Sequence, residues 1–139
     1  MNWYQYEKAC RNLLKKKFKT AHIELTTKGG SRGGDNGVDI SIKFSNGSLM
    51  YAQCKHYDPS WEGINKVDFI GIDQIRAFKW CMERDKVQRG YYFSTVPFSE
   101  PAKFIAKVNG IEPIYYDPES TKETATGFKV FNLIKAPTN

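Results

Sequence analysis

Cysteine, histidine and long hydrophobic runs are scarce in this 139-residue chain, and each scarcity excludes a class of protein. The three cysteines lie far apart without a CxxC pair, which argues against a disulfide framework or a zinc site and favours a reducing, cytoplasmic compartment. The two histidines, His22 and His56, have no second histidine or cysteine at metal-ligand spacing. No apolar run approaches the ~18 residues that a membrane span needs, and the first ten residues do not resemble a signal peptide. We therefore expect no membrane partner.

Positive charge, by contrast, is abundant. Lys and Arg number 21 against 15 Asp and Glu, which gives a net charge of +6 and a pI near 9.2. A surplus of this size favours a polyanionic partner such as DNA, with a generic basic surface as the alternative. Hydrophobic residues make up 40% of the chain, which is enough for a single domain over residues 1–139 to fold around its own core.

The hydrophobic pattern predicts an α/β fold, a mixed central β-sheet flanked by helices, with the element order α-β-β-β-α-β-α-β. Helices are expected at residues 3–18, 66–84 and 97–109, and strands at 21–27, 38–44, 48–57, 90–95 and 111–117. Pro113 indicates that the last strand lies at a sheet edge. The core is expected to cover about 3–117. Residues 118–139 form a C-terminal extension, in which 128–135 are a candidate further strand.

The strands at 38–44 and 48–57 carry the chemistry. Apolar and polar residues alternate in the first strand, and an Asn-Gly pair at 46–47 predicts a tight hairpin turn between the two. In the second strand residues 50, 52 and 54 share the inward face, so Gln53 and Lys55 share the other face. The hairpin is therefore expected to gather Asp39, Gln53 and Lys55 on its polar side.

One carboxylate, one amide and one lysine in this arrangement suit metal-dependent phosphodiester cleavage. Mg²⁺ prefers oxygen ligands, which Asp39, the Gln53 amide and the backbone carbonyl of Cys54 would supply, and Mn²⁺ would substitute for it. Lys55 would hold the attacking water or stabilise the developing charge. The alternative is a solvated hairpin face on which Asp39 and Lys55 form an ordinary cross-strand ion pair. The Cys54 side chain is expected in the core and not as a nucleophile.

Glu7 favours the metal site over that alternative. It falls on the core-facing side of the predicted helix at 3–18, between Leu14 and Phe18 in projection. A carboxylate there is costly unless it is paired or bound to a cation, so Glu7 is a fourth candidate site residue and metal ligand. The alternative is that Glu7 lies at the edge of the apolar face and reaches solvent.

A glycine-rich loop at residues 28–37 precedes the strand that holds Asp39. It is not a P-loop, because no GK[ST] opens a helix after it. Its glycines would let a nucleic-acid backbone approach closely, with Lys28 and Arg32 on phosphates. Tyr57 and Lys66 are further candidate DNA contacts. The alternatives are a flexible turn for the loop and packing roles for the residues that follow Lys55.

Three motifs, GGDNGVDI, YAQCKHY and GYYFSTVPFSEPA, together resemble the catalytic domain of the Mrr-like restriction endonucleases, which belong to the PD-(D/E)xK nuclease superfamily. The resemblance covers about residues 3–117 and includes an Asp after Gly-Val, a Q-x-K in place of E-x-K, and a T…F…A pattern. It implies a restriction-endonuclease-like fold, with Asp39 as the metal aspartate, Gln53 as the second site residue, Lys55 as the catalytic lysine and Glu7 as the helix-one glutamate. Archaeal Holliday-junction resolvases share that glutamate but carry E-x-K, which leaves the present site one negative charge short of theirs.

We therefore predict a Mg²⁺-dependent deoxyribonuclease, an endonuclease whose partner is DNA. Proteins of this kind usually join the catalytic domain to a separate recognition domain, and none is apparent here. A homodimer or a separate recognition subunit is thus a candidate partner. A structure-specific nuclease of replication or repair, acting on Holliday junctions or flaps, and a non-cleaving DNA-binding module on the same fold are the alternatives.

Overall fold

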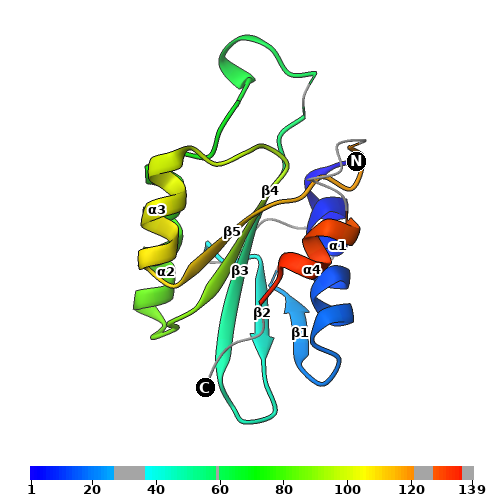
Figure 1. The fold of residues 1–139 in the computed structure, drawn as a ribbon, viewed down its shortest axis with the longest axis vertical. Coiled ribbons are helices and arrows are strands. Elements are labelled where there is room, and N and C mark those ends of the chain that lie inside the picture. Colours follow the sequence, from blue (N-terminus) through cyan, green and yellow to red (C-terminus); the bar gives the residue numbers. More distant parts are fainter. Residues whose placement is uncertain (27–36, 59, 121–126, 136–139) are drawn as a thin grey trace.

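The computed structural model describes residues 1–26, 37–58, 60–120 and 127–135 (Figure 1). In chain order the elements are α1 (Trp3–Lys17), β1 (His22–Leu25), β2 (Ile40–Lys43), β3 (Leu49–Lys55), the 3₁₀ turn η1 (Gly63–Asn65), α2 (Ile72–Arg84), β4 (Gly90–Ser94), α3 (Glu100–Val108), β5 (Ile111–Tyr115) and α4 (Gly127–Leu133).

Within the described residues the five strands form a mixed sheet whose spatial order, β1-β2-β3-β4-β5, follows the chain. β1, β2 and β3 pair antiparallel, whereas β3, β4 and β5 pair in parallel. The predicted α/β class and element order are confirmed, and β5 with its Pro113 lies at a sheet edge as expected.

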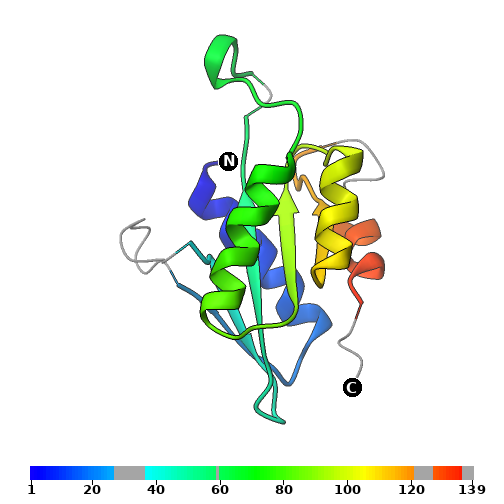
Figure 2. The same ribbon diagram turned by 90° about the vertical axis from the view of Figure 1, so that its left-hand side faces the viewer.

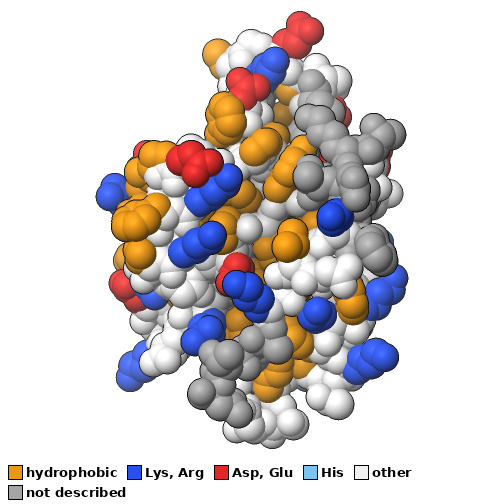
Figure 3. All heavy atoms as spheres, viewed as in Figure 1, with side chains coloured by type: hydrophobic (Ala, Val, Ile, Leu, Met, Phe, Trp, Pro, Cys, Tyr) orange, Lys and Arg blue, Asp and Glu red, His pale blue; other side chains and the backbone are white. Residues whose placement is uncertain are grey.

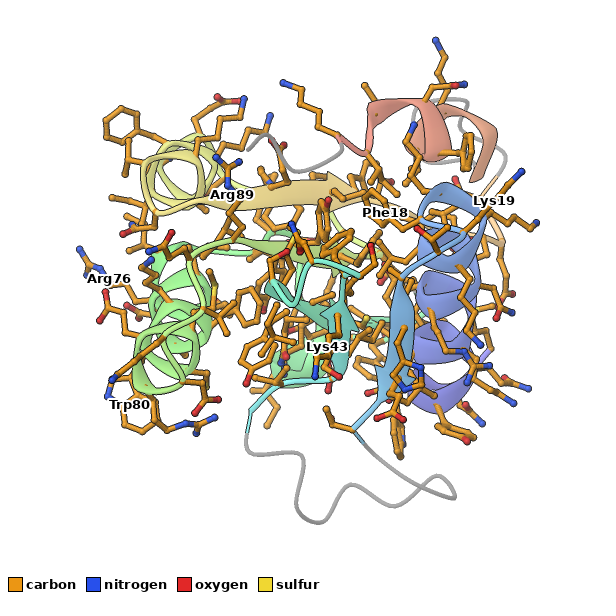
Figure 4. All side chains as sticks on the ribbon, turned by 90° about the horizontal axis from the view of Figure 1, so that it is seen from below. Phe18, Lys19, Lys43, Arg76, Trp80 and Arg89 are labelled. Carbon is orange, nitrogen blue, oxygen red and sulfur yellow. The ribbon has the colours of Figure 1, made fainter. Side chains whose placement is uncertain are left out.

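Helices cover both faces of the sheet (Figures 1 and 2). Figure 4 views the layers end-on, with α2 and α3 on one side of the sheet and α1 and α4 on the other. The apolar interior is accordingly divided into two clusters. One packs α1 and α4 against sheet residues such as Ile40 and Ala52, and the other packs α2 and α3 against Tyr92 and Ile111.

α1 positions one of the site residues, and local chemistry sets where it begins. Asn2 and Gln5 form a reciprocal capping box, each side chain accepting from the other residue's backbone N–H at 2.8 Å. Three lysines occupy the last turn, where positive charge suits the helix dipole. Phe18, labelled in Figure 4, then anchors the helix end by stacking on Tyr91 of β4, with ring centroids 6.3 Å apart.

The helix predicted at 66–84 is wrong in its first part, because α2 begins only at Ile72. The backbone of Ile70 is engaged elsewhere: its N–H donates to the Pro97 carbonyl and its carbonyl accepts from the Ser99 N–H, both at 2.9 Å. Gly71 then caps the helix. Residues 66–70 therefore belong to the long connection between β3 and α2, which projects from the body of the protein (Figures 1 and 2).

The candidate strand at 128–135 is also wrong, because Gly127–Leu133 form the helix α4. Val130 and Ile134 are four residues apart, share one helical face and are buried in the cluster under α1. The Ile134 N–H donates to the Val130 carbonyl at 3.1 Å. The core thus includes side chains beyond residue 117.

Candidate active site

The candidate site lies where β2 begins opposite the far end of β3. Ile40 pairs with Ala52, so continuing the antiparallel register by one position places Asp39 across from Gln53. The Asp39 backbone is held on both sides: its N–H donates to the Ala52 carbonyl at 3.3 Å, and its carbonyl accepts from the Thr26 N–H at 2.9 Å. Asp39 and Gln53 are both buried, at 4% and 8% exposure.

The Asp39 side chain adds one hydrogen bond between the two strands of the hairpin, beyond the last backbone pair. Its Oδ2 accepts a hydrogen bond from the backbone N–H of Cys54 at 2.8 Å. In a strand the N–H and C=O of one residue point to the same side, so the Cys54 carbonyl also points toward the Asp39 side of β3. The Cys54 side chain lies in the core beneath α1, where burial raises the pKa of its thiol, and a neutral buried thiol is not a nucleophile.

The Gln53 amide reaches the same carboxylate. With its nitrogen turned inward it donates to Asp39 Oδ2 at 3.3 Å and to the Gly37 carbonyl at 2.9 Å. With its oxygen turned inward, three oxygens face one another, and a cation would satisfy them. A carboxylate, an amide and a backbone carbonyl are a set of hard oxygen donors, so the residues present fit a divalent cation of the Mg²⁺ type.

Glu7 joins this group from the opposite layer. It is 3% exposed on the core-facing side of α1, so its carboxylate lies in the interior and not in solvent. The pKa of Asp39 is raised to about 7: burial is the largest cause, the negative charge of Glu7 and a hydrogen bond with it add to the rise, and the Cys54 N–H and the Lys55 charge oppose it. Two carboxyl groups in contact cannot both ionise without a counter-charge, which a bound cation would supply.

Lys55 is the last residue of β3 and is half-buried beside the carboxylates. Its positive charge lowers the pKa of Asp39. The backbone of β3 at this point is joined to β4, because the Thr95 N–H donates to the Lys55 carbonyl at 3.1 Å. The described residues therefore bring together all four predicted catalytic positions, Glu7, Asp39, Gln53 and Lys55.

The predicted DNA contacts divide into two groups. Lys28 and Arg32 lie outside the described residues. Tyr57 and Lys66 line a hollow of about 680 Å³ at the carboxyl ends of β3, β4 and β5. Its lining also includes Asp58, Asp68, Asp117 and Glu119, and none of the four predicted catalytic positions. Tyr57 is half-buried, and the exposed Lys66 Nζ lies 4.0 Å from Asp68 Oδ1.

Gly37 belongs to the Gly-Val-Asp pattern, but the sequence assigned it no role in the site. Its φ of +81° favours glycine, and a Cβ there would lie 2.7 Å from the Cys81 sulfur on α2. This close approach fixes the carbonyl that faces Gln53. A glycine two residues before Asp39 was visible in the sequence, but the contact with α2 depends on tertiary structure.

Two features are absent from the part of the chain that the structure describes. No group of three or more His, Cys, Asp or Glu side chains within residues 1–26, 37–58, 60–120 and 127–135 is placed to hold a metal ion. The oxygen donors described above therefore include an amide and backbone carbonyls beside the carboxylates. In the same part of the chain, no helix is both long and apolar enough to cross a membrane.

Comparison with known proteins matches this geometry to a family and a fold. The family model described as restriction endonuclease, the Mrr catalytic type, matches residues 1–116. No curated protein sequence matches the chain.

Several solved structures resemble the chain, three of them as follows. A protein of unknown function, AF1548, has a TM-score of 0.62 at 17% identity over 93% of this chain and 65% of that one. The DNA modification-dependent restriction endonuclease AspBHI has a TM-score of 0.58 at 14% identity, over 95% of this chain and 30% of that one. The MspJI restriction endonuclease in complex with a 27-mer oligonucleotide has a TM-score of 0.51 at 15% identity, over 91% of this chain and 26% of that one. At these identities the likeness establishes the fold, and the chain spans 65% or less of each of these proteins.

Proposed function

The chain belongs to the Mrr-type restriction endonuclease family, and on that premise we propose that it is a metal-dependent DNA endonuclease that acts through Asp39, Gln53 and Lys55. One observation carries the proposal: two buried carboxyl groups, a buried amide and inward-facing backbone oxygens converge where β2 begins opposite the end of β3. Such a group is costly in a protein interior unless it serves to bind a cation.

Asp39, Gln53 and the Cys54 carbonyl would hold Mg²⁺ or Mn²⁺, with Glu7 as a further ligand or as support for the metal's water shell. When bound, the metal would supply an acidified water and a positive charge for the phosphoryl oxygens. The chain's own residues hold the Asp39 carboxylate in position. The Cys54 N–H fixes one oxygen of Asp39 at 2.8 Å, and Gln53 lies across the hairpin at 3.3 Å.

Lys55 would act on the substrate. Its ammonium group, half-buried at the end of β3, would orient the attacking water and stabilise the charge that develops on the scissile phosphate. A cation held in a partly desolvated position does this more effectively than one in bulk water. Lys55 thus has a role in the chemical step, separate from general attraction for DNA.

DNA binding would draw on the whole charge distribution. Lysine and arginine side chains are scattered over the face seen in Figure 3, with fewer acidic groups between them, in keeping with the net charge of +6. We place Tyr57 and Lys66 in contact with the DNA, because both line the hollow that begins directly after Lys55, together with Lys28 and Arg32 of the glycine-rich loop. A homodimer or a separate recognition subunit would supply the choice of target.

Cleavage assays test the proposal directly. The purified protein is incubated with duplex, methylated, single-stranded and branched DNA, in Mg²⁺, in Mn²⁺ and in chelator. We expect metal-dependent cleavage that Asp39→Ala abolishes, whereas Asp73→Ala, which removes an exposed aspartate from the first turn of α2, leaves it intact. Undiminished cleavage by Asp39→Ala at ordinary metal concentration would contradict the assignment.

A further inference from the structure

The strand that carries Lys55 continues past its ladder with β4. The regular pairing ends where Lys55 lies opposite Ser94. Beyond that point the chain runs through residues 56–58 into the long connection that projects from the body of the protein (Figures 1 and 2). A strand end next to a long connection is a place where fraying begins, and here it adjoins the proposed catalytic lysine.

Past the last ladder pair, the Thr95 side chain provides the hydrogen bonds to the strand that carries Lys55. Its hydroxyl accepts a hydrogen bond from the Tyr57 N–H at 2.8 Å and donates to the Tyr57 carbonyl at 3.0 Å. Its own N–H donates to the Lys55 carbonyl at 3.1 Å. Thr95 is 7% exposed, so these bonds are shielded from water. One threonine therefore holds the backbone of β3 at Lys55 and again two residues later.

We propose that Thr95 is a positioning residue that holds Lys55 in place for catalysis, an inference that rests on the function proposed above. The opposite edge of β3 is held just before Lys55, through the bond from the Cys54 N–H to Asp39. Lys55 is thus enclosed between a backbone anchored by the metal aspartate and a backbone anchored by Thr95. Loss of the Thr95 hydroxyl frees the Tyr57 backbone and leaves the Thr95 N–H as the one bond from Thr95 to β3, so that the lysine can move relative to the carboxylates.

The neighbouring Ser94 offers a matched comparison. Its hydroxyl is also buried, at 0% exposure, and also accepts from a backbone N–H, that of Val96 at 3.0 Å. That bond stays within its own segment and leaves β3 untouched. Ser94→Ala therefore removes a buried hydroxyl from the same strand end without releasing the lysine, whereas Thr95→Val keeps the shape of threonine and releases it. Thr95→Ser keeps the hydroxyl.

The experiment measures single-turnover cleavage of duplex DNA in Mg²⁺, DNA affinity in chelator, and thermal stability for the three variants and the unsubstituted protein. Thr95→Val should lose about 10²-fold in the rate of the chemical step, the loss typical of a displacement near 1 Å, with unchanged DNA affinity. Thr95→Ser should restore most of the rate. Ser94→Ala should cut at nearly the full rate even if its melting temperature falls as far as that of Thr95→Val.

Amide hydrogen exchange on the unsubstituted protein gives a second measurement that needs no variant to fold. The Tyr57 amide should be protected, and free exchange there would overturn the inference. Full-rate cleavage by Thr95→Val, or equal rate losses in Thr95→Val and Ser94→Ala, would overturn it while leaving the proposed function intact. Absence of DNA cleavage by the unsubstituted protein would overturn both.

Discussion

Replacing Gln53 by glutamate tests the central geometry of the site through stability as well as activity. The Gln53 nitrogen lies 3.3 Å from Asp39 Oδ2, and Glu7 already interacts with the same carboxyl. A third carboxylate at that distance would repel Asp39 by about 5 kcal/mol at an effective dielectric constant of ~20. The protein can escape this repulsion by keeping one carboxyl protonated, which for a glutamate of ordinary pKa costs roughly 3.7 kcal/mol at pH 7 and about 1 kcal/mol at pH 5. We therefore expect Gln53→Glu in chelator to lose up to about 4 kcal/mol of unfolding free energy at pH 7 and about 1 kcal/mol at pH 5.

Proton linkage sets the direction in which this stability changes with pH. The carboxyl pKa is raised in the folded state, so the folded protein binds more protons than the unfolded chain, and stability falls as pH rises from about 4 to about 7. Mg²⁺ should restore more stability to Gln53→Glu than to the parent protein, because an added carboxylate attracts the cation. The assay is urea denaturation at both pH values, with and without metal, and Gln88→Glu at an exposed position is the control. Equal stability losses at pH 5 and pH 7 would refute the proximity of Gln53 to the carboxylates.

Three further predictions use the same protein preparations. Lys55→Ala should abolish cleavage in single-turnover kinetics while its DNA affinity, measured by filter binding, persists. Cleavage at the parental rate would show that Lys55 has no role in the chemical step. Gly37→Ala should lower the free energy of unfolding by more than the ~1–2 kcal/mol expected from the positive φ alone, because the new Cβ would lie 2.7 Å from the Cys81 sulfur. Gly47→Ala, also at positive φ but in open space, should lose only that conformational part in denaturant unfolding. DNA affinity should fall steeply with salt in titrations from 50 to 200 mM, because lysines and arginines release counterions from phosphates, and a flat response would point to a different partner.

The hairpin at the centre of the site was predictable because its determinants are local. Alternation along residues 38–44 and the Asn-Gly turn set the register, and the register places Asp39 across from Gln53. The burial of Glu7 likewise follows from helical periodicity within α1. In both cases the pattern lies within one hairpin or one helix, whereas the contact between Glu7 and Asp39 depends on how α1 packs on the sheet.

The features that were missed depend on distant partners. The backbone of Ile70 bonds to Pro97 and Ser99, far along the chain, and this pairing overrides the helical spacing of the apolar residues before α2. Gln53 was expected on a polar face, but α2 and α3 cover that face and the amide is 8% exposed. Thr95 belongs to the T…F…A pattern of the resemblance, but that pattern did not indicate what its hydroxyl contacts. Its relation to Tyr57 arises only when β3 and β4 are paired.

The agreement between strand order in space and strand order along the chain bears on how the protein is made. Synthesis releases β1, β2 and β3 before β4 and β5, and each new strand joins an open edge instead of inserting between two earlier ones. Glu7, Asp39, Gln53 and Lys55 all leave the ribosome early, but Thr95 follows with β4. We expect a nascent chain to hold its cleaving residues in a loosely ordered hairpin until β4 docks, so that nuclease competence appears late in synthesis. A chain ended before Gly90 that still cut DNA would contradict this timing.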